Sequence, residues 1–447
     1  MRPSPVQAVA DALADDIRGG RLAPGALLPT HRQLAARHGI ALASASKAYA
    51  LLKSMGLVVG ETGRGTFVRD RPQERDWDEG DEARLSADAA DLSFNHPALP
   101  GQAELLRAML RELAACGDLA ALMRQQPPGG RLHERETVAR FLAQARGIAA
   151  APQRIFLVNG AQQGLDIAAR AVLAPGDAVA VDALTYPGFR MLAQAQGFAL
   201  KPVPALPGGP DLQALEALCR SRPVRAIYAM PTLHNPLGWV LSPAQRRRLV
   251  EIARRHDCAL IEDAAYAYLA GRAPPALAAL APERTFYVSS LSKSVATGLR
   301  FGYLAAPESF APRVKALVRA SHWSLPGVVT AMAARWMADG TVARLEAAHR
   351  RDARRRQAVA RAAFAGMDVT AHPASLFLWL RLPEGVRMDG VATALARRGI
   401  AVSKGQAYAA TRHAPHALRL GLGSLPMAEL GPVLAQVRET IERFPIR

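Results

Sequence analysis

The chain has 447 residues, half of them apolar and about a fifth charged, which is typical of a globular protein with two or three domains. No run of uncharged apolar residues is long enough to span a bilayer, so the composition excludes a membrane-spanning protein. The net charge of +18 favours a polyanion such as nucleic acid as a partner, although arginine-rich chains also carry such a charge without one.

Two further features bear on the compartment. The first 20 residues contain acidic side chains and no apolar core, so they do not predict a signal peptide. The three cysteines, Cys116, Cys219 and Cys258, show no spacing typical of a disulfide framework or a zinc site. We therefore expect a protein of the reducing cytoplasm, without a metal site.

The first 69 residues predict three helices and a hairpin. Apolar stripes and turn residues favour helices over residues 5–18, 31–38 and 43–55. Thr30 is a typical N-cap for the second helix, and Gly39 is typical of the position just beyond a last helical turn. Two short runs of β-branched and apolar residues follow around a Gly-rich turn, which completes the order of a winged helix-turn-helix.

In a helix-turn-helix, the second helix of the pair enters the major groove while the first crosses the sugar-phosphate backbone. Small hydroxyls and a cation near the start of the third helix suit phosphate and base-edge contacts. A guanidinium at the hairpin tip suits the minor groove or the backbone. The residues predicted to contact DNA are Arg32, Ser44, Ser46, Lys47 and Arg64. The alternative is that they are ordinary solvated side chains of a small helical domain.

The segments LLPTHRQLAARHG, KAYALLKSMG and GRGTFV resemble the GntR-type winged helix over residues 6–69. This resemblance implies binding to a double-stranded DNA operator. One departure from the family pattern is Leu42, which stands where an arginine often lies near the start of the reading helix, so the operator sequence stays open.

Residues 70–91 (DRPQERDWDEGDEARLSADAAD) have no apolar periodicity and are strongly acidic, which predicts a linker. They hold 3 Lys and Arg residues against 9 Asp and Glu residues, whereas residues 1–69 hold 9 against 4. The remaining residues therefore carry a net charge of +19 (18 − 5 + 6), so the positive charge of the chain is not confined to the N-terminal 69 residues.

From Leu92 onward, apolar strand-like runs alternate with stretches of helical length. Examples of the runs are RIFLVNG, DAVAVDA, RAIYAMP, CALIEDA and RTFYVSS. This alternation predicts an α/β domain with a mostly parallel sheet over residues 92–447. From about Val369 the pattern mixes strands such as LFLWLRL with helices, which predicts a smaller α/β lobe.

Residues able to bind a phosphate follow two of the predicted strands. Gly160, Ala161 and Gln162 lie between a strand and a helix start, where backbone N–H groups and the helix dipole favour a dianion. Ser290 and Arg300 follow a later strand, and an arginine fork suits phosphate geometry. A Gly-Ala turn between a strand and a helix is also common without any ligand.

Aromatic, amide and acidic side chains stand at the ends of the middle strands. Tyr186 precedes a Pro-Gly turn, and Asn235 precedes a proline. Asp263 ends a buried strand, where a carboxylate needs a partner, and Tyr266 follows three residues later. Each motif alone has a structural alternative, because such residues also occur in ordinary turns and cores.

Lys293 and Arg419 complete this set. Lys293 follows a buried strand in the segment VSSLSKS, where burial and nearby cations lower the pKa of a lysine and make its amine nucleophilic. Arg419 lies in an apolar strand, where a buried guanidinium favours a carboxylate such as that of an amino acid. The alternative for the lysine segment is a surface turn.

Pyridoxal phosphate requires a lysine for its aldehyde, an anion site for its phosphate, an acid for its ring nitrogen, donors for its phenolic oxygen and a flat partner for its ring. Over residues 91–447, the residues above and their order resemble the fold-type I aminotransferases. The resemblance assigns Lys293 to the Schiff base, Asp263 to the ring nitrogen and Tyr186 to the ring face. It assigns Asn235 and Tyr266 to the phenolic oxygen. For the phosphate it assigns Gly160, Ala161, Gln162, Ser290 and Arg300, and for the ligand carboxylate Arg419.

The whole chain resembles the MocR-type regulators of the GntR family, in which an aminotransferase-like domain follows a winged helix and head-to-tail homodimers are usual. Two further positions depart from the family pattern. Gln125 or a neighbour in QQPPGG stands where a tyrosine often reaches the phosphate of the partner subunit, which leaves cofactor affinity and transaminase chemistry open. Val158 stands where a threonine often precedes the phosphate turn.

These observations favour a transcriptional regulator that senses an amine, an amino acid or a vitamin B6 vitamer through its cofactor. A ligand amine that displaces Lys293 would let the aminotransferase-like domain shift. That shift would change how the two N-terminal winged helices of a dimer, here called the heads, bind DNA. One alternative is a working aminotransferase with an accessory head, since the catalytic lysine and its companions are present. Another is a DNA-binding protein whose large domain serves only as a dimerisation platform.

Overall fold

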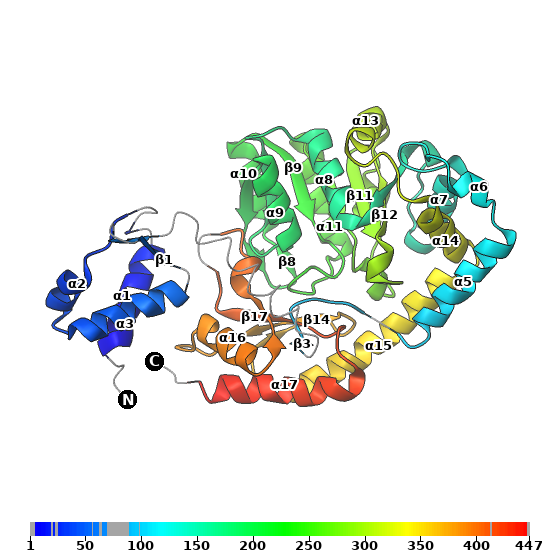
Figure 1. The fold of residues 1–447 in the computed structure, drawn as a ribbon. Coiled ribbons are helices and arrows are strands. Elements are labelled where there is room, and N and C mark those ends of the chain that lie inside the picture. Colours follow the sequence, from blue (N-terminus) through cyan, green and yellow to red (C-terminus); the bar gives the residue numbers. More distant parts are fainter. Residues whose placement is uncertain are drawn as a thin grey trace. The chain divides into compact units, whose positions relative to one another are not determined.

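The computed structural model describes residues 5–18, 21–22, 26–55, 57–61, 65–68, 89–97, 99–411 and 414–444. The chain divides into two compact units, Met1–Ser86 and Ala87–Arg447 (Figure 1). Ala90 and Asp91, which we expected in the linker, form strand β3 (Ala90–Asp91) because their backbone pairs in parallel with β15 (Ile400–Ala401). Among the described residues, no helix is both long enough and apolar enough to cross a membrane.

The first unit has the predicted order of three helices and a hairpin. Its elements are α1 (Pro5–Arg18), α2 (His31–His38), α3 (Leu42–Ser54) and the antiparallel strands β1 (Val58–Glu61) and β2 (Gly65–Val68). Thr30 caps α2 by accepting a hydrogen bond from the Gln33 amide, and Gly39 ends the helix with a φ of 61°. The winged helix-turn-helix and both cap residues are therefore confirmed.

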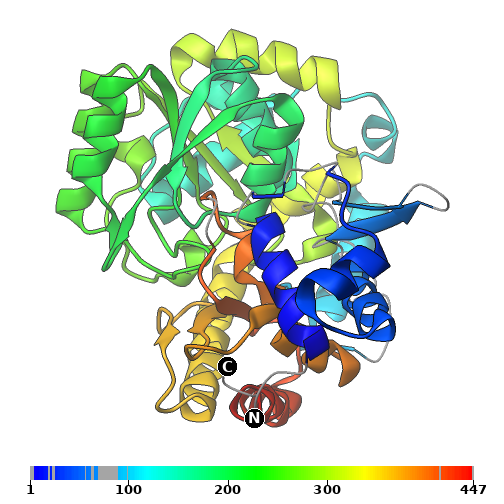
Figure 2. The ribbon, with the colours of Figure 1, turned by 90° about the vertical axis from the view of Figure 1, so that its left-hand side faces the viewer.

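The second unit is built on a seven-stranded sheet with helices on both faces (Figures 1 and 2). The strand order is β4-β12-β11-β10-β9-β5-β6, and β12 alone of these seven described strands runs against its neighbours. The strands are β4 (Ile155–Asn159), β5 (Ala178–Asp182), β6 (Ala199–Val203), β9 (Val224–Ala229), β10 (Ala259–Asp263), β11 (Thr285–Ser290) and β12 (Phe301–Ala305). The predicted mostly parallel sheet is confirmed.

Alternate residues of each strand enter different cores, because successive side chains of a strand point to opposite faces. On one face, Phe156 and Val158 belong to the core built with α8 (Gly160–Val172), α9 (Pro187–Gln196) and α13 (Ala311–Ser321). On the other face lie α7 (Leu132–Arg146), α14 (Gly327–Ala338), α10 (Leu212–Ser221), α11 (Pro243–Arg255) and α12 (Leu277–Leu280). Burial on both faces explains why runs such as RIFLVNG do not alternate with polar residues.

The C-terminal lobe has the predicted α/β composition. Its antiparallel sheet has the order β13-β14-β17-β16, with strands β13 (Val369–Thr370), β14 (Phe377–Arg381), β16 (Ser403–Lys404) and β17 (Ala417–Gly421). Against it pack α16 (Met388–Arg397), α17 (Met427–Glu442) and the end of α15 (Thr341–Ala363). α15 begins beside α14 and ends beside α17, so one helix joins the large sheet to the lobe (Figure 1).

Two further helices, α5 (Gln102–Cys116) and α6 (Leu119–Leu122), precede α7 in the chain. A short antiparallel pair, β7 (Ala205–Leu206) and β8 (Gly209–Pro210), lies between β6 and α10.

Candidate functional site

The predicted site residues gather where the parallel strands end. Carboxyl ends of parallel strands share one edge of a sheet, so residues far apart in sequence come together there. Asp263 ends β10 and Lys293 follows the adjacent strand β11, while Arg419 comes from β17 of the lobe. The charges of Arg419 and Arg300 both act on Lys293, which shows that the lobe and the large sheet meet at this site.

Lys293 is partly buried and its amine is engaged. Nζ donates a hydrogen bond of 2.5 Å to the backbone carbonyl of Asn95 and lies 4.8 Å from the ring centroid of Phe94. Burial, reinforced by the guanidinium groups of Arg419 and Arg300, lowers the pKa of this amine from 10.5 to about 7. A large fraction of the amine is therefore neutral and nucleophilic near neutral pH.

Asp263 is 2% exposed and has a donor for each carboxylate oxygen. Oδ2 accepts a hydrogen bond of 2.8 Å from the hydroxyl of Tyr228, and Oδ1 accepts one of 3.0 Å from the backbone amide of Ala265. Burial raises the pKa of Asp263, and these two donors oppose that rise. Tyr228 is itself held by Phe189, whose ring stacks on it with 3.9 Å between centroids.

The turn between β4 and α8 has the geometry of an anion site. Gly160 begins α8 with a φ of 72°, and the N–H groups of a first helical turn have no acceptor within the helix. A Cβ at Gly160 would lie 2.7 Å from Nη2 of Arg300, so the glycine lets that guanidinium approach the helix start. Arg300 remains exposed and donates to the carbonyl of Asn159 at 3.2 Å.

Ser290 and Gln162 connect to the same turn. Ser290 is buried and lies in register with Gly302, where a Cβ would lie 2.6 Å from the carbonyl carbon of Gly160. The amide of Gln162 donates to the carbonyl of Gly188 at 2.7 Å. The side chain of Gln162 therefore supports the turn that carries Tyr186. The backbone of Gln162, like that of Ala161, is part of the first turn of α8.

Tyr186, Asn235 and Tyr266 stand near the strand ends, as predicted. Burial raises the pKa of the Tyr186 hydroxyl, and the nearby Asp263 and Tyr266 raise it further. The Tyr266 hydroxyl accepts a hydrogen bond of 3.3 Å from the side-chain amide of Asn95. Asn235 is buried at the loop after β9.

Arg419 is 3% exposed in the middle of β17. Nη1 donates to the backbone carbonyl of Ser93 at 3.2 Å, and the guanidinium carbon lies 4.8 Å from the ring centroid of Phe377. Nε has no hydrogen-bond partner among the described residues. A buried guanidinium with an unused donor favours an anionic ligand.

Other buried polar atoms of this region also lack a partner within the described part of the chain. They are Oδ1 of Asn235, Oε1 of Gln162 and the hydroxyls of Ser292 and Ser294. Since buried polar atoms are normally hydrogen-bonded, a group of unpaired ones indicates a bound polar molecule. The donor set also contains a nucleophilic amine, a buried carboxylate and an anion-binding turn, and these residues fit pyridoxal phosphate.

Three residues at the site were not predicted from the sequence: Tyr228, Asn95 and Phe94. Tyr228 could have been found, because it lies in register with Ile261, two residues before Asp263 and thus on the same face of the sheet. Asn95 and Phe94 precede the first helix of the domain and carry no local signal. Glu262 lies on the opposite face, as strand alternation predicts, and accepts from the Ala278 amide at 2.9 Å.

The segment QQPPGG contains no aromatic side chain in the place of the family tyrosine. Gln126 is buried and donates to the carbonyls of Ala121 and Arg124, so it stabilises its own segment. Gln125 is exposed. Val158 is fully buried in the core beneath α8, where a valine is in its ordinary place.

In the first unit, the predicted DNA-contacting residues differ in their exposure. Arg32 and Lys47 are exposed, and Ser44 is half-buried. The half-buried Ser46 donates to the carbonyl of Leu42 at 3.1 Å and lies 2.9 Å from Nδ1 of His31. Arg64 lies outside the described residues.

Comparisons with known proteins match both units. The model for aminotransferase class I and II matches residues 87–437, and the model for bacterial regulatory proteins of the gntR family matches residues 5–68. The HTH-type pyridoxine biosynthesis transcriptional regulator PdxR of Corynebacterium glutamicum is 30% identical, over 94% of this chain and 92% of its own. The uncharacterized HTH-type transcriptional regulator YjiR of Escherichia coli is 27% identical over 98% of both chains.

Solved structures match the second unit. An archaeal alanine:glyoxylate aminotransferase superposes with a TM-score of 0.76 at 22% identity, over 83% of this chain and 96% of its own. The α-aminoadipate aminotransferase LysN of Thermus thermophilus, solved with N-(5'-phosphopyridoxyl)-L-leucine, superposes with a TM-score of 0.73 at 22% identity, over 83% and 95% of the two chains. These matches confirm the fold of a fold-type I aminotransferase.

Proposed function

Because the chain belongs to the MocR-type transcriptional regulators, in which a gntR-family head precedes an aminotransferase class I and II domain, we propose that it senses an amine bearing a carboxylate. The observation that carries this proposal is the pairing of Arg419 with Lys293. Arg419 is buried with an unused donor, and it lies close enough to Lys293 to lower the pKa of that amine. An amino acid has the two groups that such a pair binds, and an amine or vitamin B6 vitamer would use Lys293 alone.

Pyridoxal phosphate is the cofactor of this family, and when bound it supplies an aldehyde that captures amines and a ring that withdraws electrons. Within the proposed site, Lys293 supplies the amine that holds the aldehyde, and Asp263 keeps a proton on the ring nitrogen. Tyr186 covers the ring, while Asn235 and Tyr266 donate to the phenolic oxygen. The phosphate is bound by the backbone of Gly160, Ala161 and Gln162 and by the side chains of Ser290 and Arg300.

In the head, α3 is proposed to enter the major groove of an operator. Lys47 and Ser44 would contact phosphates and base edges from its first turns, and Ser46 would do so only by giving up its bond to Leu42. Arg32 at the start of α2 would bind a backbone phosphate. Arg64 would contact the minor groove or the sugar-phosphate backbone of the operator.

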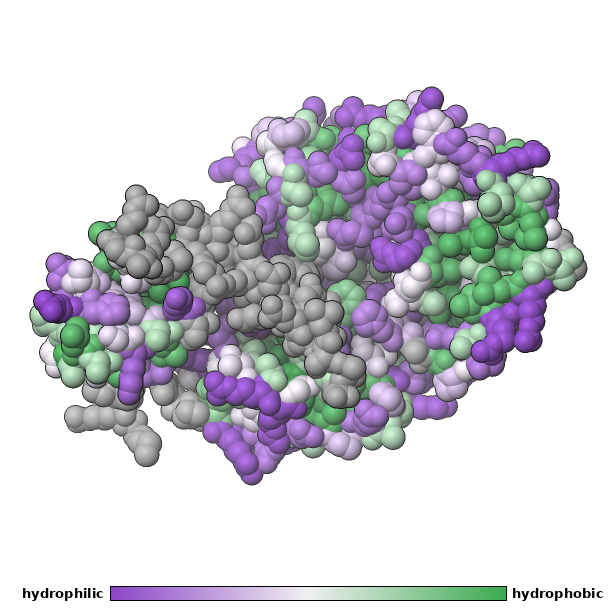
Figure 3. Space-filling model, viewed as in Figure 1, coloured by the Kyte–Doolittle hydropathy of each residue, from purple (hydrophilic) through white to green (hydrophobic). Residues whose placement is uncertain are grey.

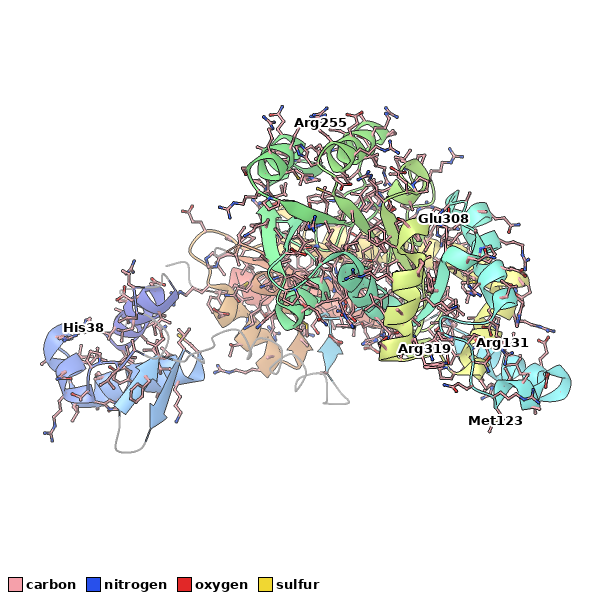
Figure 4. The ribbon with its side chains drawn as sticks, turned by 90° about the horizontal axis from the view of Figure 1, so that it is seen from above. His38, Met123, Arg131, Arg255, Glu308 and Arg319 are labelled. Carbon is pink, nitrogen blue, oxygen red and sulfur yellow. The ribbon has the colours of Figure 1, made fainter. Side chains whose placement is uncertain are left out.

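A homodimer is part of the proposal. Large apolar side chains are exposed on α5, α6 and the ends of α7 and α14: Leu106, Leu110, Leu119, Met123, Leu132 and Val328. Figure 3 shows a broad apolar surface over these helices, and Met123, labelled in Figure 4, is 87% exposed. Contiguous apolar patches mark interfaces, and a second copy of the chain is the proposed occupant.

Borohydride reduction of the purified protein, followed by peptide mass spectrometry, tests the cofactor site. We expect a yellow protein whose cofactor becomes irreversibly attached to Lys293. Candidate amino acids and amines would then be screened for a change in the absorption spectrum and in binding to a DNA duplex selected from a random pool by the full-length protein. A protein without sequence-preferring DNA binding, with or without cofactor, would contradict the regulator proposal.

Aminotransferase activity is a second candidate. The amine of Lys293 has a lowered pKa, and the carboxylate of Asp263 accepts a hydrogen bond from Tyr228; such chemistry uses both features. Turnover of amino donors with keto-acid acceptors measures it directly. Rates comparable with those of metabolic aminotransferases would make catalysis the main role. Slow turnover alongside ligand-dependent DNA binding supports sensing.

A further inference from the structure

A short segment, Ser93–Pro97, lies over the proposed site, and we refer to it as the strap. It follows β3 and precedes α5. Oδ1 of Asp91 accepts hydrogen bonds from the backbone amides of Ser93 at 2.8 Å and Phe94 at 3.2 Å, which sets the turn into the strap. Asn95 is only 1% exposed, so the middle of the strap is part of the protein interior.

The strap provides partners for three proposed site residues. The carbonyl of Asn95 accepts from Nζ of Lys293, and the carbonyl of Ser93 accepts from Nη1 of Arg419. The side-chain amide of Asn95 donates to the hydroxyl of Tyr266. Each of these three groups is one that the cofactor or its ligand would engage, so occupancy of the site competes with contacts of the strap.

Two glycines after Arg419 make room for the strap. A Cβ at Gly421 would lie 2.2 Å from the carbonyl oxygen of Phe94, and one at Gly423 would lie 3.2 Å from Oδ1 of Asn95. The backbone amide of Gly423 donates to the same Oδ1 at 3.1 Å. Asn95 therefore links Tyr266, which follows β10, to the end of the strand that carries Arg419.

We propose that the strap transmits occupancy of the ligand site to the DNA-binding head, with Asn95 as the positioning residue that couples them. The inference rests on the proposed function. A ligand carboxylate is a better acceptor for Arg419 than the neutral carbonyl of Ser93, because charge-assisted hydrogen bonds are about twice as strong as neutral ones. A ligand that takes Arg419 removes one of the two donors to the carbonyl of Ser93, the other being the hydroxyl of Ser403 at 2.8 Å. The strap continues through β3 into the residues that lead to the head.

Two non-covalent probes separate the ligand carboxylate from the cofactor. N-(5'-phosphopyridoxyl)-L-leucine contains the cofactor ring, the phosphate and an amino-acid carboxylate, whereas pyridoxamine phosphate lacks the carboxylate. Hydrogen exchange is measured on the full-length, cofactor-free protein with each probe. We expect the carboxylate probe to speed exchange in residues 89–97 by about fivefold or more relative to pyridoxamine phosphate, as one or two hydrogen bonds are lost.

The outcomes distinguish the inference from the proposed function. Unchanged exchange in the strap while the carboxylate probe is bound would overturn the strap proposal and leave the sensing proposal intact. Failure of both probes to bind would overturn the cofactor site itself, and the strap proposal with it.

Coupling to DNA is tested with a duplex selected from a random pool by the full-length protein. The ratio of DNA affinities with and without the carboxylate probe should change by about tenfold in the wild type, the range of an ordinary allosteric coupling. In Asn95→Ala the ratio should approach one while the probe and the DNA each still bind. An unchanged ratio in this variant would overturn the role of Asn95.

Two further variants guard against loss of folding. Asn95→Leu has nearly the size of the native side chain and removes both the donor to Tyr266 and the acceptor for the Gly423 amide, so it should also lose the coupling. His96→Ala changes an exposed position of the same strap and should keep the wild-type ratio. Loss of coupling in His96→Ala as well would overturn the assignment to Asn95.

Discussion

The hydroxyl of Tyr228 donates a hydrogen bond of 2.8 Å to the carboxylate of Asp263, and both side chains are almost completely buried. The two residues lie on adjacent parallel strands and on the same face of the sheet. A carboxylate in such a place tends to take up a proton, because burial raises its pKa. The Tyr228 donor opposes this rise and so keeps Asp263 available as an anion for a protonated ring nitrogen.

Tyr228→Phe keeps the ring that stacks on Phe189 and removes the donor to Asp263. We expect a further rise in the pKa of Asp263 and a loss of about tenfold in affinity for pyridoxal phosphate, since a hydrogen bond to a charged group contributes about 1.5 kcal/mol. Titration of the cofactor-free protein, followed by absorbance, measures the dissociation constant. Tyr287→Phe, buried on the opposite face, is the control, and an equal loss in both variants would contradict the assignment.

Capture of the cofactor by Lys293 should become faster as the pH rises and should level off above a midpoint near 7, because only the neutral amine is nucleophilic. Arg419 is one of the charges that lower this pKa, so Arg419→Gln should move the midpoint upward. Stopped-flow mixing with pyridoxal phosphate over a range of pH measures both profiles. A midpoint that stays in place in the variant would show that Arg419 does not contribute and that burial and Arg300 lower the pKa of Lys293.

The same amine makes the stability of the cofactor-free protein depend on pH. The pKa of folded Lys293, about 7, is below its ordinary value of 10.5, so the folded state binds this proton less tightly than the unfolded state does. The stabilising contribution is complete above pH 10.5 and is lost progressively as the pH falls from 10.5 to about 7. Lys293→Met should remove this part of the pH dependence in denaturant unfolding; identical profiles for the two proteins would argue against the shifted pKa.

Gly160→Ala tests the anion site. The substitution introduces a Cβ that would lie 2.7 Å from Nη2 of Arg300, at a backbone φ of 72°. We expect affinity for pyridoxal phosphate to fall by about tenfold or more, with little change for pyridoxal, which lacks the phosphate. Gly147→Ala is the matched control, because its φ is 67° and no atom lies within 4 Å of the added Cβ. If the control lost as much affinity, backbone strain would explain the result.

Lys47→Ala should weaken DNA binding to all sequences by a similar factor. A lysine that contacts a phosphate adds about one unit to the slope of log affinity against log salt concentration, so the variant should lose about that much. Fluorescence anisotropy at several salt concentrations measures the slope. Lys53→Ala, near the far end of α3, should leave it unchanged, and the opposite ranking of the two variants would reverse the proposed orientation of the helix in the groove.

Much of the fold could be predicted because its signals are local. Thr30 and Gly39 mark the ends of α2 through cap chemistry that needs no tertiary contact. Runs such as RIFLVNG are apolar on both faces because helices cover both sides of a parallel sheet. The strand at Ala90 and Asp91 could not be predicted, because its pairing with Ile400 and Ala401 depends on residues more than 300 positions away.

The residues of the candidate site also differ in whether local signals could predict them. Lys293, Asp263 and Gly160 stand in motifs next to predicted strands, so their positions followed from the strands. Asn95 has no motif, and its importance arises only where the fold brings residues 266, 293 and 423 around it. The phosphate prediction for Gln162 concerned its backbone; the contact of its side chain with the carbonyl of Gly188 could not be predicted, because it depends on how α9 packs beside α8.

The pairing of β3 with β15 determines where this protein can be divided for experiments on its separate activities. A fragment beginning at Gln102 would retain Lys293 but would leave it without the Asn95 carbonyl, and the edge of β15 would be open to other chains. A fragment beginning at Ala87 would retain both. Ligand affinities measured on a truncated protein will therefore match those of the intact chain only when the cut lies on the head side of β3.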